Sequence, residues 1–173
     1  MCSSIETISL DFFETSFILF SSIGLIVSRK LNINFIDIDH EIEKNLGTKI
    51  SNIFETNGEK YFRKIEEMLT LKILKKQKSV ISLGGGAFLN NKIKKEVLEN
   101  HISFWLNWDN RTLINRIKKS QKRPVAFNAS NSELFELIKK RSIVYSKAMY
   151  KIDCENLTKS EIAKIILKIY EAH

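Results

Sequence analysis

The sequence predicts an α/β fold built on a parallel sheet, and two observations support this class. From Asn32 onward, short apolar runs of strand length alternate with longer stretches of helical periodicity. Alternation of this kind is typical of parallel strands joined by helices. The chain has 173 residues, 43% of them hydrophobic, which is long enough for one packed core and short for two. We therefore expect a single domain over residues 1–173.

The alternation begins with a predicted strand at residues 34–39, read as NFIDID, and a helix that closes at Gly47. Glycine commonly follows the last residue of a helix because it tolerates left-handed backbone angles. A second helix is predicted over residues 61–74, since apolar residues recur there along one helical stripe: Phe62, Ile65, Leu69 and Ile73. Upstream, residues 8–13 form a candidate strand that would take the central place in the sheet.

The later elements follow in the same order. Three more strands are predicted, at residues 79–83, 102–108 and 150–154. Asp109 is placed to cap a helix that runs to residue 119, and a further helix is predicted at residues 132–140. A capping box formed by Thr158 and Glu161 opens the last helix.

The charge and the cysteines exclude several classes of protein. A net charge of +8 suits an anionic partner such as a nucleotide, a phosphorylated metabolite, RNA or a membrane surface, and charge alone does not choose among them. A nucleic-acid-binding domain is disfavoured because the arginines are dispersed and no basic motif is interleaved with aromatic residues. The apolar stretch 17–27 is too short for a membrane span and lacks the basic start of a signal peptide. Cys2 and Cys154 provide neither a disulfide framework nor a four-ligand zinc site, so we expect a cytoplasmic protein.

Two patterns near predicted strand ends could carry chemistry. Asp37 and Asp39 would share one face at the carboxyl end of their strand, where open α/β sheets bind ligands. Such a pair can order a metal ion and accept a proton from a hydroxyl, but it can also be a strand end followed by a helix-capping aspartate. The run Gly84, Gly85 and Gly86 allows a ligand to approach the backbone closely, or it is a tight turn.

Four arginines fall in or beside the predicted loops and helix ends: Arg63, Arg116, Arg123 and Arg141. A guanidinium group in such a place can bind a carboxylate or a phosphate through two hydrogen bonds. Arg123 lies in the polar stretch 120–132, which is the longest predicted loop and therefore a candidate lid.

In this order the motifs resemble those of shikimate kinase, a P-loop family of the nucleoside-monophosphate-kinase type. The resemblance runs from about Lys30 to the C-terminus and rests on five segments: FIDID (35–39), IFETNGEKYFRKIEE (53–67), SLGGGA (82–87), KRP (122–124) and LIKKRSIVYSKA (137–148). It implies a three-layer α/β/α domain with a central parallel sheet. It also implies a monomer that transfers phosphate from ATP, with Mg²⁺, to the 3-hydroxyl of shikimate in aromatic amino-acid biosynthesis, with no nucleic-acid or membrane partner.

The resemblance assigns roles to residues of both substrates' sites. Asp39 corresponds to the catalytic base, which also binds the shikimate hydroxyls. Arg63 and Arg141 resemble the pair that holds the shikimate carboxylate, and Gly85 the glycine whose backbone meets the substrate. Residues that line or brace this site are Gly84, Gly86, Glu66, Phe54 and Phe62. For ATP, Arg123 resembles the lid arginine and Arg116 the one near the adenine, while Ser21 and Asp37 correspond to the metal site.

The resemblance breaks in the atypical segment 1–20. The family's phosphate loop reads GxxGxGK[ST], and its three glycines and its lysine fall here on Glu14, Phe17, Leu19 and Phe20. A frame or assembly fault upstream of about Ser21, a genuine loss of ATP turnover, or a phosphate site supplied by another group would each explain this break. We favour the first, because acceptor-site residues would also drift in a protein that had lost its activity. The alternative function is a shikimate-binding protein that does not turn over ATP.

Overall fold

The computed structural model describes residues 8–11, 17–76, 78–119 and 129–173, with the backbone alone for 8–11, 17–20 and 119. Its sheet has five strands in the order β2-β3-β1-β4-β5, and every neighbouring pair is parallel. The strands are β1 (Ile8–Asp11), β2 (Asn34–Asp37), β3 (Ser79–Ser82), β4 (Ile102–Asn107) and β5 (Tyr150–Asp153). The parallel α/β class is therefore confirmed, and the candidate N-terminal strand takes the central position.

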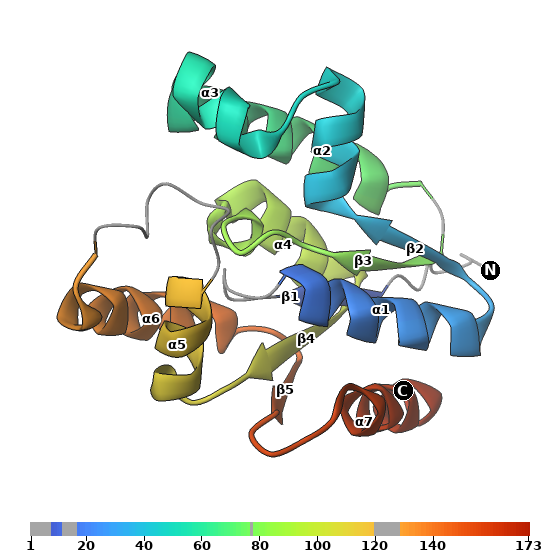
Figure 1. Cartoon of the computed structure of the whole chain (residues 1–173). Coiled ribbons are helices and arrows are strands. Elements are labelled where there is room, and N and C mark those ends of the chain that lie inside the picture. The colour runs from blue at the N-terminus through green and yellow to red at the C-terminus, as the bar shows by residue number, and fades with distance from the viewer. Residues whose placement is uncertain (1–7, 12–16, 77, 120–128) are drawn as a thin grey trace.

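Helices cover both faces of this sheet, which gives the expected three layers (Figure 1). On one face α1 (Phe17–Leu31) packs against α7 (Lys159–Glu171), and on the other α4 (Asn91–Asn100) packs against β4. Helices α2 (Ile38–Leu46) and α3 (Ile50–Leu74) pack against each other at one end, and α5 (Asn110–Lys119) contacts α6 (Asn131–Tyr145). The short 3₁₀ helix η1 (Ala87–Leu89) follows the glycine run.

Most predicted helix ends are confirmed by their capping bonds. Gly47 follows α2 with a φ of 64°, in the left-handed region. Asp109 accepts a hydrogen bond of 2.8 Å from the Thr112 N–H and so caps α5. Thr158 and Glu161 form the complete capping box of α7. These signals are local, which explains why the sequence reports them well.

Three predicted boundaries are wrong by two residues or more. The helix predicted to begin at Tyr61 is part of α3, which begins at Ile50 and contains a break in its helical angles at Gly58, where φ is 78°. The strand predicted at residues 34–39 ends at Asp37, because the Asp37 carboxylate accepts a hydrogen bond from the His40 N–H and starts α2. The helix predicted at 132–140 spans Asn131–Tyr145, because Ser130 and Glu133 form a capping box at its start and the helix continues through Arg141. Of the loop predicted at 120–132, residues 120–128 lie outside the described part, and Asn131 already belongs to α6.

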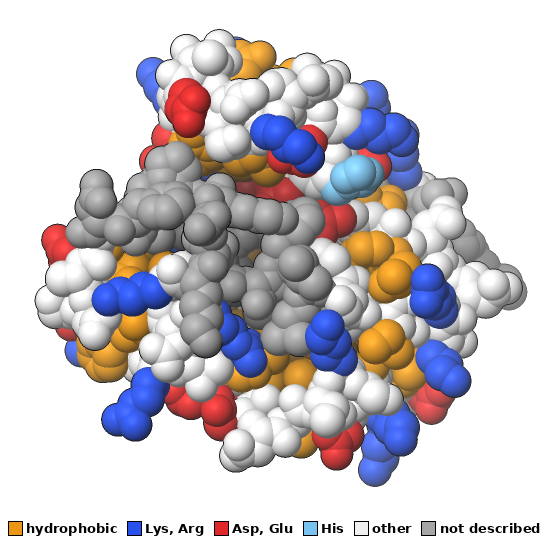
Figure 2. Space-filling view, in the orientation of Figure 1, with side chains coloured by type: hydrophobic (Ala, Val, Ile, Leu, Met, Phe, Trp, Pro, Cys, Tyr) orange, Lys and Arg blue, Asp and Glu red, His pale blue; other side chains and the backbone are white. Residues whose placement is uncertain are grey.

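The core joins side chains from both faces of the sheet. Ile23, Phe62, Phe104 and Ile166 are fully buried, and their helices and strands come from all parts of the chain. Within the described residues, no helix is both long enough and apolar enough to cross a membrane. Figure 2 shows Lys and Arg side chains dispersed over the visible face, and acidic side chains in the recess beneath α2 and α3.

Candidate active site

The candidate site lies where β2 and β3 end. Asp37 is the last residue of β2 and pairs in register with Ser82, the last residue of β3. The chain after β3 continues into Gly84, Gly85 and Gly86, so the glycine run and the aspartates meet at the carboxyl edge of the sheet. Ligands of open parallel sheets bind at this edge.

Asp37 and Ser21 are brought together here from different elements. The Ser21 hydroxyl, in α1, donates a hydrogen bond of 2.7 Å to Asp37 Oδ2. The other carboxylate oxygen, Oδ1, accepts from the His40 N–H at 3.1 Å. A hydroxyl beside a carboxylate is an oxygen donor set that fits Mg²⁺, an ion that binds few protein ligands and keeps several waters. Among the described residues no cluster of three or more His, Cys, Asp or Glu side chains could hold a metal.

Asp39 does not share a strand face with Asp37 as predicted. It lies in the first turn of α2, and only 4% of its surface is exposed. The helix start turns its carboxylate toward the glycine run: a Cβ added to Gly84 would lie 2.7 Å from Asp39 Oδ1 and 3.2 Å from Glu66 Oε1. Position 84 therefore has no room for a side chain, and two buried carboxylates pack against its backbone.

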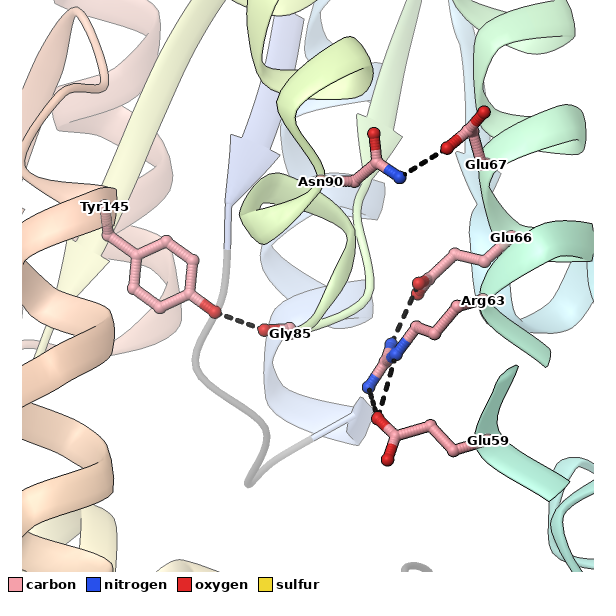
Figure 3. A network of polar contacts seen from close by, with 7 residues as sticks. All are labelled: Glu59, Arg63, Glu66, Glu67, Gly85, Asn90 and Tyr145. Carbon is pink, nitrogen blue, oxygen red and sulfur yellow. Dashed lines mark hydrogen bonds and ion pairs between the residues drawn. The ribbon is translucent and has the colours of Figure 1, made fainter. Parts of the chain in front are cut away.

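Arg63 is held on α3 by two acids of the same helix (Figure 3). Its Nη1 lies 2.8 Å from Oε2 of Glu66, whose side chain is 2% exposed. Its Nε and Nη2 both contact Glu59 Oε1, at 3.2 and 3.1 Å, and the Glu59 side chain is 56% exposed. Glu66 is thus a buried, fixed partner of Arg63, whereas Glu59 is a partner at the surface.

The glycine run contacts this arginine directly. A Cβ on Gly86 would collide with the guanidinium group of Arg63. On the other side of the loop, the Tyr145 hydroxyl donates a hydrogen bond to the Gly85 carbonyl (Figure 3). The loop is therefore enclosed between α3 and α6, with backbone rather than side chains facing both.

Phe54 and Phe62 brace Arg63 from within α3. Their ring centroids lie 4.8 Å apart, and the Arg63 Cζ lies 5.2 Å from the centroid of the Phe62 ring. Phe62 is fully buried, so it anchors this turn of α3 in the core. The predicted site residues of α3, including Glu66, therefore do come together.

Arg141 comes from the opposite side, on α6. Its Nε and Nη1 atoms are buried. It precedes Tyr145 by four residues, a spacing that places two side chains on the same helix face. Because Tyr145 reaches Gly85, this face of α6 is the one that turns toward the glycine run.

Arg116 lies apart from these residues, on α5 near the ends of β4 and β5. Its Cζ is 4.7 Å from the ring centroid of Trp108, and burial lowers the pKa of its guanidinium below the usual range. Within the described part of the chain, its buried Nη1 has no hydrogen-bond partner. The other arginine predicted for this half, Arg123, lies outside the described residues.

Several contacts at the site were not predicted. The Asn90 side chain, at the start of α4, donates a hydrogen bond of 2.6 Å to Glu67 on α3 (Figure 3). Lys92 donates to the other oxygen of the same carboxylate. These hydrogen bonds, first from Lys92 and then from Asn90, lower the pKa of Glu67. Tyr145 lies within the segment LIKKRSIVYSKA (137–148), yet by pattern it is an ordinary core aromatic residue. Only the fold brings such distant partners together.

Comparison with known proteins finds one family. A family model described as shikimate kinase matches residues 21–171, so the atypical segment 1–20 lies outside the match. The chain is 38% identical over 153 residues to shikimate kinase from Thermodesulfovibrio yellowstonii, covering 87% of this chain and 88% of the relative. It is 37% identical over 154 residues to the enzyme of the same name from Bacillus subtilis, covering 86% and 81%.

Solved structures give the same result. The crystal structure of shikimate kinase from Aquifex aeolicus superposes with a TM-score of 0.84 at 33% identity, covering 95% of this chain and 96% of that one. Shikimate kinase from Acinetobacter baumannii in complex with shikimate superposes with a TM-score of 0.87 at 24% identity, covering 98% and 94%. At that identity the second comparison supports the fold alone.

Proposed function

The chain belongs to the shikimate kinase family, and on that premise we propose that it transfers the γ-phosphate of ATP to the 3-hydroxyl of shikimate. The observation that carries the proposal is the meeting of a buried aspartate, a doubly held arginine and a glycine run at one sheet edge. These groups match what a small hydroxylated carboxylic acid needs: a cation for its carboxylate and an acceptor for its hydroxyl.

Arg63 and Arg141 are the proposed partners of the shikimate carboxylate. Arg63 lies against Gly86 from α3, and Arg141 is four residues from Tyr145 on α6, the residue that bonds Gly85. A guanidinium group pairs with a carboxylate through parallel N–H bonds. Glu66 would hold Arg63 in place during binding, because its side chain is buried and bonded to Nη1 at 2.8 Å. Phe54, Phe62 and the glycines 84–86 would shape the same site.

Asp39 is the proposed general base. In the reaction the 3-hydroxyl oxygen forms a bond to the γ-phosphorus, the bond from that phosphorus to the β–γ bridging oxygen breaks, and ADP leaves. The proton of the hydroxyl passes to the Asp39 carboxylate. The position of Asp39 in the first turn of α2 supports this role, because its buried carboxylate lies against the glycine run, where the acceptor hydroxyl would bind.

The nucleotide half is proposed from separate residues. Ser21 and Asp37 would hold Mg²⁺, Asp37 through water, and the ion when bound would neutralise charge on the phosphates. Arg116 would lie against the adenine, since its guanidinium is half-buried and one buried N–H lacks a partner among the described residues. Arg123 is assigned to ATP by the family motif alone. We propose that the domain, residues 1–173, acts as a monomer on these two small substrates.

A coupled assay of ADP release tests this function. The purified chain is incubated with MgATP, with and without shikimate, and the product is identified by phosphorus NMR as a phosphate ester at the 3-position. Release of ADP that depends on shikimate is the expected result. If the folded chain binds shikimate and releases no ADP, the binding-only alternative replaces the kinase, and the substitutions at Glu14, Phe17, Leu19 and Phe20 explain it.

A further inference from the structure

The Gly85 carbonyl differs from its neighbours in the glycine run because it accepts a hydrogen bond from a distant side chain. The Gly84 and Gly86 carbonyls accept hydrogen bonds from the N–H groups of Ala87 and Leu89, at 2.9 and 3.1 Å, within the turn itself. The Gly85 carbonyl accepts from the Tyr145 hydroxyl, 60 residues away in the sequence. A buried carbonyl needs a donor, so this bond completes the hydrogen bonding of the turn.

The position of the Tyr145 hydroxyl is fixed by packing. The side chain is fully buried. Its ring centroid lies 6.3 Å from that of Phe88 and 6.4 Å from that of Trp105, so aromatic side chains from η1 and β4 contact it. The hydroxyl therefore holds the Gly85 carbonyl at a defined place rather than following it.

This bond sets the direction of the next N–H group. In a planar trans peptide the C=O of one residue and the N–H of the next point in opposite directions. Figure 3 shows Tyr145 on one side of the glycine loop and Arg63 with Glu66 on the other. With its carbonyl held toward Tyr145, the peptide between Gly85 and Gly86 turns the Gly86 N–H toward the Arg63 side.

We infer that Tyr145 is a positioning residue for the acceptor substrate: it orients the Gly85–Gly86 peptide so that the Gly86 N–H meets the substrate beside Arg63. This inference rests on the proposed function. Tyr145 and Arg141 lie on the same face of α6, so one helix would place both a cation and a backbone donor of the acceptor site. Gly86 is suited to this role, since any side chain there would displace Arg63.

The first test compares Tyr145→Phe with the unchanged chain. This substitution removes the hydroxyl and keeps the ring. We expect titration calorimetry to show shikimate binding weakened about tenfold, because the Gly86 N–H would no longer be held toward the charged substrate. Loss of a buried bond also lowers stability. Ile162→Val, a buried substitution on α7, is the matched control: it should lower the melting temperature and leave shikimate affinity within twofold.

The second test follows the Gly85–Gly86 peptide by NMR. With glycine labelled at both nitrogen and carbonyl carbon, only Gly85 and Gly86 show a coupled carbonyl–nitrogen pair, because they alone among the six glycines follow another glycine. We expect shikimate to shift the Gly86 amide signal in the unchanged chain and to shift it far less in Tyr145→Phe.

Equal shikimate affinities for Tyr145→Phe and the unchanged chain would overturn the positioning role. So would a Gly86 amide signal that does not shift when shikimate is added to the unchanged chain. If the unchanged, folded chain fails to bind shikimate, the proposed function fails, and this inference fails with it.

Discussion

The proposed acceptor half and the proposed nucleotide half of the site are built from different segments of the chain. The acceptor half gathers α2, α3, the glycine run and α6, and its members are tied by contacts among buried groups such as Glu66 and Tyr145. In the proposed nucleotide half, the Ser21 hydroxyl donates a hydrogen bond to Asp37, and the Arg116 guanidinium lies against the Trp108 ring. Each half uses different segments of the chain, so one can change while the other stays.

The difference also separates what the fold requires from what the chemistry requires. β1 takes the central place in the sheet and α1 begins at Phe17, although the four key positions of the family's phosphate loop hold Glu14, Phe17, Leu19 and Phe20. A central strand needs only a backbone that pairs on both sides. Phosphate binding needs open N–H groups and a cation, which these residue types do not supply.

The largest effect should come from removing an acceptor-site cation. Arg63→Ala and Arg141→Ala are each expected to weaken shikimate binding by about 2 to 4 kcal/mol, because each leaves a carboxylate incompletely paired. Titration calorimetry measures both. Arg29→Ala, an exposed arginine in the last turn of α1, is the control and should change nothing. If Arg63→Ala and Arg141→Ala both bind shikimate with unchanged affinity, these arginines are not the partners of its carboxylate.

A smaller loss is expected from Gly86→Ala, since its Cβ would collide with the Arg63 guanidinium and push it aside. We expect shikimate affinity to fall about tenfold, or ~1.4 kcal/mol. Gly47→Ala is the matched control: its φ of 64° makes alanine destabilising there, but nothing lies within 4 Å of the added Cβ. Gly47→Ala should therefore lower the melting temperature and leave shikimate affinity unchanged. An affinity loss in Gly47→Ala but not in Gly86→Ala would contradict the proposed contact of position 86 with Arg63.

The nucleotide half is probed in a background that restores the phosphate loop, with Glu14, Phe17 and Leu19 changed to Gly and Phe20 to Lys. In that background Arg116→Ala should weaken MgATP binding by about 1 kcal/mol, as loss of a stacked guanidinium group does. Shikimate affinity should stay constant, because Arg116 lies with Trp108 and away from the glycine run. If Arg116→Ala weakens shikimate binding and leaves MgATP binding unchanged, the assignment of Arg116 to the nucleotide half is wrong.

The smallest effect has the opposite sign. Glu59 occupies the Nε and Nη2 edge of Arg63, where a substrate carboxylate would bind. Because exposed ion pairs contribute about 0.2 to 1 kcal/mol, Glu59→Gln should tighten shikimate binding by roughly 1.5- to 5-fold. Glu66→Gln removes the buried partner of Arg63 and should weaken binding instead. Changes of the same sign in both variants would show that the two acids act alike.

The sequence predicts those features whose signals are local. The capping residues Asp109 and Thr158, the glycine after α2 and the order of strands and helices all follow from neighbouring residues. The end of β2 was misplaced because NFIDID continues the alternation of a strand, while Asp37 in fact caps a helix. Ser130 and Glu133 have the spacing of a capping box, so the sequence also contains a local signal for the start of α6.

The contacts that define the acceptor half could not be read in this way. Asn90 with Glu67 and Tyr145 with Gly85 join residues 23 and 60 positions apart, and neither pair has a spacing that marks it in the sequence. Their formation depends on how α3, α4 and α6 pack around the glycine run. The motif resemblance proposed which residues form the site, and the fold shows which of them contact one another.

The measurement that tests the acceptor half most directly is titration calorimetry of the purified, folded chain with shikimate. We expect saturable binding of one shikimate per chain, weakened by about 2 to 4 kcal/mol in Arg63→Ala, whether or not MgATP binds. Absence of binding heat, in a chain that unfolds in one cooperative transition, would contradict an intact acceptor site.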